Sequence, residues 1–178
     1  CCLWFAVDYD GRTWCYRELY VTGQNIDQIA QEINRLSGQE QYQYSIAGRD
    51  IFAKTGYVGK WGEETGAQTF ARHGITFLPA TIRRFDGWNM MHQYLNWNEH
   101  QLPKLIFFNT CYNAIRTIPT LIHDDVKKED LDTRGQDDVA DATRYFLMSL
   151  HESKTIPPLT EVEKKIQKMK EEKFNLDA

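Results

Sequence analysis

Three aspartates crowd the start of one predicted helix near the carboxyl end of the chain: Asp137, Asp138 and Asp141. Spacings of three and four residues place the first two on the same side of a helix as the third. Their like charges repel unless a cation, a basic partner or a raised pKa relieves them, and a hard divalent metal is the sharpest such relief. For a single aspartate, capping the helix and complementing its dipole is an adequate explanation. Capping and the helix dipole do not account as well for three aspartates at one helix start.

A fourth acid, Asp50, ends the run Gly48-Arg49-Asp50 after a short strand predicted over 43–47. In α/β proteins, sites are usually built at the carboxyl ends of strands. Two-metal phosphodiester cleavage needs carboxylates from separate elements, arranged around ions that lie roughly 3.5–4 Å apart. Asp50 and the acidic helix start are such a pair of elements, so general chemistry already suggests a divalent-metal site.

Composition indicates one globular unit rather than a nucleic-acid-coating protein. With 178 residues, of which 42% are hydrophobic and 13% aromatic, the chain can bury one core and is most simply a single domain. A net charge of -4 and a pI near 5.7 give no overall basic surface. Any contact with nucleic acid must therefore come from a local patch.

The four cysteines, at positions 1, 2, 15 and 111, form neither a Cys-x-x-Cys pair nor a spaced framework. This argues against structural zinc and against a disulfide-stapled secreted domain, and it favours reduced, intracellular thiols. No apolar run approaches the roughly 20 residues needed to cross a bilayer, which predicts a soluble protein. The chain starts without Met inside the apolar run 1–7, which predicts a fragment of a longer polypeptide.

Strands and helices are predicted to alternate along the chain. Asp10-Gly11 joins strands over 2–7 and 12–21 in a hairpin. Apolar periodicity and stop signals predict further strands over 43–47, 75–78 and 105–108, and helices over 26–36, 69–73, 83–97, 114–121 and 137–151. In the last helix, the apolar residues at helical spacing are Val139, Ala142, Phe146 and Leu150. This order predicts an α/β fold with a mixed sheet covered on both faces by helices.

Two segments fall outside this pattern. Residues 55–66 carry four glycines around Tyr57, Lys60 and Trp61 and are predicted to be a surface loop, with binding of a nucleic-acid backbone as the less favoured alternative. Residues 153–178 are predicted to form a linker and a peripheral charged helix that starts at a capping box of Thr160 and Glu163. The expected division is therefore a domain over 1–152 and a tail over 153–178.

Basic and histidine side chains give weaker signals. Arg49, Arg83 and Arg84 lie near predicted strand ends, where phosphate contacts and surface salt bridges are equally good explanations. The five histidines lack metal-ligand spacing, and His73 before Gly74 is better explained as a helix C-terminal residue. The aromatic side chains near the start, Trp4, Trp14 and Tyr16, are expected to be core or sheet-face residues rather than a base-stacking platform.

A series of short sequence motifs, spread in order over about 135 residues, resembles a known protein family. In chain order they are Asp10-Gly11, Tyr16-Arg17-Glu18-Leu19-Tyr20, Ile46-Ala47, Asp50-Ile51-Phe52, His73-Gly74-Ile75, Pro79-Ala80, Arg84, Gly87-Trp88, Ile115-Arg116-Thr117-Ile118-Pro119, Glu129-Asp130-Leu131-Asp132-Thr133 and Asp137-Asp138-Val139-Ala140-Asp141-Ala142-Thr143-Arg144-Tyr145. In this order, the chain resembles the nuclease domain of the large terminase subunit of tailed bacteriophages, which has a ribonuclease H-like fold.

The resemblance implies a Mg²⁺- or Mn²⁺-dependent endonuclease that cuts concatemeric double-stranded DNA by two-metal hydrolysis during viral genome packaging. It also implies an ATPase domain in the same polypeptide, a portal and a small terminase subunit as partners, and no membrane. The location that it implies is the cytoplasm of the bacterial host.

The resemblance also assigns site residues. Asp50 matches the second acid, although many relatives carry that acid where this chain has Gly48. Asp137 or Asp138 matches the third, and many relatives have His at the latter position; Asp141 is a further ligand or a supporting residue. The catalytic set is then Asp50, Asp137, Asp138 and Asp141, and the metal ligands are Asp50 with Asp137 and Asp138.

The first acid of the family lies on a strand that would precede residues 1–7. Asp8 is an alternative, but its place beside Asp10-Gly11 favours a turn residue. We therefore expect the chain alone to be a weak or inactive nuclease. The competing interpretation is a non-catalytic docking or DNA-binding module of the packaging motor with an incomplete acid set. A third is another ribonuclease H-like enzyme, such as a resolvase or integrase.

Overall fold

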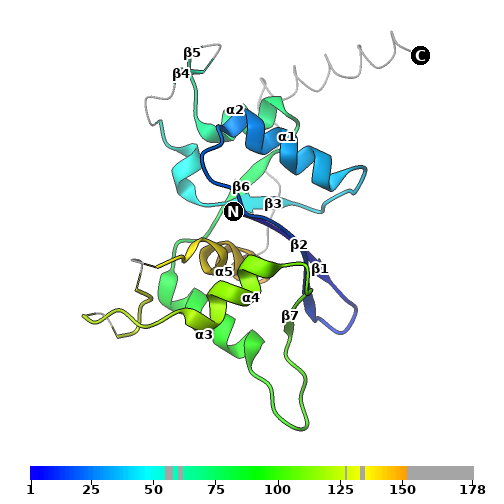
Figure 1. Ribbon diagram of the computed structural model, residues 1–178, viewed down its shortest axis with the longest axis vertical. Coiled ribbons are helices and arrows are strands. Elements are labelled where there is room, and N and C mark those ends of the chain that lie inside the picture. The colour runs from blue at the N-terminus through cyan, green and yellow to red at the C-terminus, as the bar shows by residue number, and fades with distance from the viewer. Residues whose placement is uncertain (55–57, 60–61, 127, 133–134, 152–178) are drawn as a thin grey trace. The chain divides into compact units, whose positions relative to one another are not determined.

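The computed structural model describes residues 1–54, 58–59, 62–126, 128–132 and 135–151 (Figure 1). They form two compact units. Unit 1 comprises Cys1–Asn25, Ile46–Arg49 and the described residues from Pro79 onwards, and unit 2 comprises Ile26–Ser45 and the described residues of Asp50–Leu78. The predicted C-terminal helix lies outside the described residues.

Unit 1 is built on a three-stranded mixed sheet in the order β1-β2-β7. β1 (Cys2–Val7) and β2 (Thr13–Leu19) are antiparallel, and β2 is parallel to β7 (Leu105–Phe107) with Thr13 opposite Leu105. Asp8 fixes the turn between β1 and β2, because its carboxylate accepts the backbone N–H groups of Asp10 and Arg12 and the indole N–H of Trp14. The interpretation of Asp8 as a turn residue is therefore confirmed.

Three helices accompany this sheet in unit 1: α3 (Arg84–Leu95), α4 (Tyr112–Thr117) and α5 (Asp138–Leu150) (Figure 1). α5 contacts α3, α4 and β1. The rings of Phe5 on β1 and Phe146 on α5 stack with centroids 4.1 Å apart. α4 is shorter than predicted because the chain continues as a 3₁₀ turn, η2 (Ile118–Thr120), around Pro119, which lacks the N–H that a longer helix needs.

The buried face of α5 differs from the predicted apolar stripe. Val139 is fully buried, whereas Ala142, Phe146 and Leu150 are only partly buried. The side chains buried in their place are Ala140, Thr143, Arg144, Leu147 and Met148. Polar side chains are tolerated there because Thr143 Oγ1 donates to the carbonyl of Val139 at 2.7 Å and Arg144 pairs with an aspartate.

Unit 2 contains α1 (Ile26–Ser37) packed on α2 (Gly66–Arg72), together with the 3₁₀ turn η1 (Arg49–Phe52), which begins one residue earlier in unit 1. The chain crosses the boundary between the units along β3 (Ser45–Ala47) and β6 (Phe77–Pro79), which pair in a two-stranded sheet. α1 matches its prediction, and Ala30 and Ile33 of its apolar stripe are buried.

The segment 55–66, predicted to be a surface loop, contains a short strand pair that was not predicted. β4 (Val58–Gly59) and β5 (Gly62–Glu63) pair antiparallel within it. Strands of two residues in a glycine-rich run carry no alternating apolar pattern, so periodicity does not reveal them.

The expectation of a mixed α/β fold is confirmed, but the strands do not join in one sheet. The described strands form three small sheets, of three, two and two strands. β3 and β6 pair with each other and not with the β1-β2-β7 sheet. Which strands pair is decided between segments far apart in the sequence, so local sequence patterns do not predict it. Among the described residues, no helix combines the length and apolar character that a bilayer crossing requires.

Candidate metal site at the start of α5

Asp137 is the residue immediately before α5, and its side chain is not used as a helix cap. Its backbone carbonyl accepts the N–H of Asp141 at 2.8 Å, but its carboxylate makes no capping hydrogen bond. Partial burial raises the pKa of Asp137, and the negative charges of Asp141 and Asp138 raise it further, against weaker opposition from its own backbone N–H and from Arg84. Capping therefore does not explain this acid, and its charge is not fully compensated.

Asp138, the first residue of α5, is exposed and accepts a hydrogen bond from Tyr20. The phenol oxygen lies 2.9 Å from Asp138 Oδ2. This bond, with burial and the nearby negative charge, raises the pKa of Tyr20, so the phenol stays protonated and is the donor. Tyr20 directly follows β2, and the contact ties the start of α5 to the end of that strand.

Asp141 lies one turn into α5 and pairs with Arg144 on the same helix. Asp141 Oδ1 accepts from Arg144 Nε at 3.1 Å and from Nη2 at 2.8 Å. The arginine side chain is only 2% exposed, whereas the aspartate side chain is 24% exposed. The guanidinium group therefore compensates the charge of Asp141 from the protein interior.

Arg84 supports the cluster from α3 through a further acid. Asp130 Oδ1 accepts three donors: Arg84 Nε at 2.9 Å, Trp88 Nε1 at 3.0 Å and the backbone N–H of Leu131 at 2.8 Å. Burial alone would raise the pKa of Asp130, but these hydrogen bonds outweigh it and hold the pKa below its usual value. Arg84 thus makes the salt bridge that was one of its two predicted roles.

A fifth acid, Glu18 on β2, holds α4 in place. Its carboxylate accepts the backbone N–H groups of Asn113 and Ala114 at 2.6 and 3.0 Å and the side-chain amide of Asn113 at 2.9 Å. It occupies the helix N-terminus, where unpaired N–H groups favour an anion. Glu18 is therefore a structural carboxylate.

Asp50, the other predicted ligand, is exposed in the first turn of η1, three residues after β3 ends. Its expected place just after a strand is confirmed. It belongs to unit 2, whereas the three aspartates of α5 belong to unit 1. Its meeting with them around metal stays a prediction.

The other two predicted arginines also make contacts within the protein, and their contacts with phosphate stay a prediction. Arg83 pairs with Asp86 at 2.9 Å on the exposed side of α3, and Arg49 Nε donates to the carbonyl of Ala80 at 3.4 Å. His73 is the C-terminal cap of α2, as predicted.

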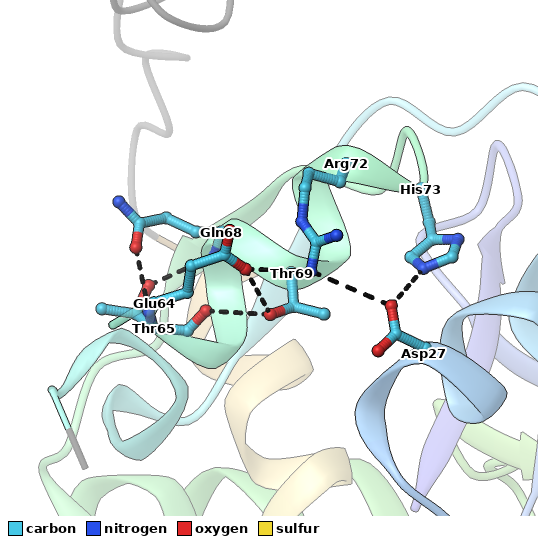
Figure 2. A network of polar contacts seen from close by, with 7 residues as sticks. All are labelled: Asp27, Glu64, Thr65, Gln68, Thr69, Arg72 and His73. Carbon is cyan, nitrogen blue, oxygen red and sulfur yellow. Dashed lines mark hydrogen bonds and ion pairs between the residues drawn. The ribbon is translucent and has the colours of Figure 1, made fainter. Parts of the chain in front are cut away.

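Unit 2 has its own charged network, and it is compensated internally (Figure 2). Arg72 Nη2 lies 2.9 Å from Glu64 Oε2, and His73 Nε2 lies 2.8 Å from Asp27 Oδ1. The hydrogen bond from His73 holds the pKa of Asp27 below its usual value. Each acid in this network therefore has a basic partner, which distinguishes it from the start of α5.

Divalent-metal chemistry fits the start of α5 better than it fits Glu18, Asp130 or the charged network of unit 2, whose acids have basic or N–H partners. Mg²⁺ and Mn²⁺ prefer carboxylate oxygens and keep several water molecules, and Asp137 and Asp138 offer such oxygens where negative charge is not fully compensated. Within the described part of the chain, no three His, Cys, Asp or Glu side chains converge as a ready metal-binding group. Other groups, water or substrate oxygens must complete any ligand set here.

Comparison with known proteins finds no family model, no curated protein and no solved structure that matches the chain. The case for a function therefore depends on the residues and on their arrangement.

Sequence reasoning predicted a salt bridge for Arg84 but missed its partner Asp130, and it missed the roles of Tyr20 and Arg144 beside the acids. Tyr20, Asp130 and Arg144 all occur within the short sequence motifs that carry the resemblance. The available signal was therefore their position in those motifs, since local periodicity says nothing about contacts between distant residues.

Proposed function

We propose that this chain is the metal-dependent endonuclease domain of a phage DNA-packaging terminase, with a ribonuclease H-like fold. The observation that carries the proposal is the clustering of Asp137, Asp138 and Asp141 at the start of α5, where burial and the two neighbouring carboxylates raise the pKa of Asp137 and Arg84 opposes them only in part. A divalent cation relieves this repulsion, and it is the cofactor that two-metal phosphodiester hydrolysis requires.

In this proposal Asp137 and Asp138 hold Mg²⁺ or Mn²⁺ at the start of α5. Such ions activate water and stabilise the leaving oxygen of the phosphodiester. Tyr20 donates to Oδ2 of Asp138 and so fixes the orientation of that side chain. The other carboxylate oxygen, Oδ1, is left to bind a cation. Arg84, the first residue of α3, is held by Asp130 and offsets part of the negative charge around Asp137.

The wider setting belongs to the same proposal and is supported by the resemblance. The substrate is concatemeric double-stranded DNA in the cytoplasm of the bacterial host. The partners are the ATPase domain of the same polypeptide, the portal and the small terminase subunit.

One observation favours the alternative of a non-catalytic docking or DNA-binding module. The position at which many relatives carry the second acid is Gly48 here, and Asp50 lies two residues later on a 3₁₀ turn. An incomplete acid set would leave the fold intact while it removes cleavage.

Metal binding separates the two functions. The ¹⁵N-labelled chain is titrated with Mn²⁺, and paramagnetic broadening of backbone amides is mapped along the sequence. We expect broadening centred on the first turn of α5 at submillimolar to millimolar Mn²⁺, and its loss in Asp137→Asn. Asp86→Asn is the matched control, because Asp86 is an exposed aspartate that pairs with an arginine three residues away on α3.

Cleavage of supercoiled plasmid in Mn²⁺ is measured in parallel. We expect weak cleavage that Asp137→Asn abolishes. Broadening at α5 without cleavage supports an incomplete acid set. Absence of broadening at α5 in millimolar Mn²⁺ contradicts the proposed metal site and favours the docking module.

A further inference from the structure

Arg144 is the most deeply buried charged residue near the acidic start of α5. Its side chain is 2% exposed, and two of its nitrogens, Nε and Nη2, donate to the same oxygen of Asp141. Its third nitrogen, Nη1, is buried without a hydrogen-bond partner in the described part of the chain. A buried guanidinium group of this kind is costly unless an anion compensates it, and Asp141 is that anion.

The surroundings of Arg144 leave its side chain little freedom. The guanidinium carbon lies 5.0 Å from the ring centroid of Trp88 and 4.5 Å from that of Tyr145. The aliphatic part fills the space beside Gly87, where any Cβ would overlap its Cγ and Cδ. Packing therefore fixes the guanidinium group, and the guanidinium group in turn fixes Asp141.

The three aspartates consequently differ in charge compensation. Oδ1 of Asp141 accepts hydrogen bonds from the positively charged guanidinium group of Arg144. In the described part of the chain, Asp138 accepts from the neutral phenol of Tyr20, and the charge of Asp137 is offset by its own backbone N–H and by Arg84. A divalent cation gains most from carboxylates whose charge is least offset by hydrogen-bonded guanidinium groups.

We propose that Arg144 is a positioning residue that holds Asp141 through Oδ1 and offsets its charge, so that a divalent cation at the start of α5 is bound by Asp137 and Asp138 in preference to Asp141. This inference rests on the proposed function and deepens it, because it fixes which of the three acids are ligands. In this view Arg144 determines the net charge at the start of α5 and how many of its carboxylates bind the metal.

The test compares Arg144→Met, Arg144→Lys, Asp141→Asn and Asp137→Asn with the wild-type chain. Met keeps the bulk against Trp88 and removes the charge, whereas Lys keeps a charge that still reaches Asp141. Binding is read as free Mn²⁺ by electron paramagnetic resonance, and far-ultraviolet circular dichroism confirms that each variant is folded. No activity measurement is needed.

Arg144→Met is expected to bind Mn²⁺ roughly three- to tenfold more tightly than wild type, because it releases a third carboxylate and removes a nearby positive charge. Arg144→Lys is expected to restore the wild-type affinity, an effect that a purely structural role of the arginine would not produce. In the Arg144→Met background, Asp141→Asn is expected to remove the gain. In the wild-type background it is expected to weaken Mn²⁺ binding far less than Asp137→Asn does.

Two results would overturn the inference. The first is that Arg144→Met is folded but binds Mn²⁺ no more tightly than wild type. This result overturns the inference even if Mn²⁺ binding to wild type is too weak to measure. The other is Asp141→Asn that weakens binding as much as Asp137→Asn, which decides the matter if Arg144→Met fails to fold. Failure of the proposed function is a separate result, in which Mn²⁺ binding to wild type does not depend on Asp137.

Discussion

Gly87 on α3 and Arg144 on α5 approach so closely that no side chain fits between them. A Cβ on Gly87 would overlap Cγ and Cδ of Arg144, both far inside the closest approach of real carbon atoms. The two helices contact each other in unit 1, and this glycine leaves the space that the arginine side chain occupies while it pairs with Asp141 on its own helix. The geometry of the acidic site thus depends on a residue that carries no side chain.

Gly87→Ala is therefore expected to destabilise the protein, although alanine has the higher helix propensity by about 1 kcal/mol. Overpacking typically costs about 1–3 kcal/mol, and so close an overlap belongs at the upper end of that range, so after the gain in propensity we expect a net loss of roughly 1–2 kcal/mol in the free energy of unfolding. Urea unfolding followed by tryptophan fluorescence measures it. Gly135→Ala is the control, because nothing lies within 4 Å of the place that a Cβ would take there. Equal stability of the two variants would contradict the close approach.

The capping box of α2 gives a second prediction. Thr65 Oγ1 accepts the N–H of Gln68 at 3.2 Å, and Gln68 Oε1 accepts the N–H of Thr65 at 2.8 Å (Figure 2). Thr65→Ala removes one of these bonds and loosens the other, which is expected to cost about 1 kcal/mol. Hydrogen exchange of the first-turn amides of α2 should accelerate, while the exposed substitution Thr22→Ala leaves it unchanged. Unaltered protection in Thr65→Ala would rule out the cap.

The cysteines give a third prediction. Cys15 and Cys111 are fully buried with their sulfur atoms 3.8 Å apart, and burial raises the pKa of both thiols. Cys1 is exposed. Iodoacetamide at pH 8 should therefore modify Cys1 at least ~100-fold faster than either buried thiol, because modification requires the thiolate and access. Peptide mass spectrometry reads each site, and denaturant should equalise the rates. Rapid native labelling of Cys111 would show that this core is open.

Local patterns explain what could be predicted about this fold. The Asp-Gly turn located the β1-β2 hairpin, and helical periodicity located α1 and α3. The contacts that organise the acids join distant parts of the chain, as when Tyr20 meets Asp138 across 118 residues. Such pairings depend on how elements pack, which no short window of sequence contains. The burial of Arg144 was missed for the same reason, since burial of a charge becomes reasonable only beside Asp141 and Gly87.

The pH dependence of stability should distinguish Asp137 from Asp130. Folding raises the pKa of Asp137, so the folded chain binds more protons than the unfolded chain as pH rises from the unfolded to the folded pKa. Stability from this group therefore falls over that interval and stays lower at neutral pH. Asp137→Asn is expected to stabilise the protein at pH 7 in the absence of divalent metal, and to lose that advantage near pH 3, where the carboxyl is protonated in both states.

Asp130 has the opposite sign, because hydrogen bonds from Trp88, Arg84 and Leu131 outweigh burial and lower its pKa. Its contribution is present above the unfolded pKa and is lost as pH falls through the folded pKa. Asp130→Asn should therefore destabilise the chain at pH 7, by roughly 1–3 kcal/mol for the lost charged hydrogen bonds. Urea titrations of both variants at pH 7 and pH 3 measure the two effects. If Asp137→Asn also destabilised the chain at pH 7, the charge at the start of α5 would be compensated, and the strongest reason to place a metal there would be gone.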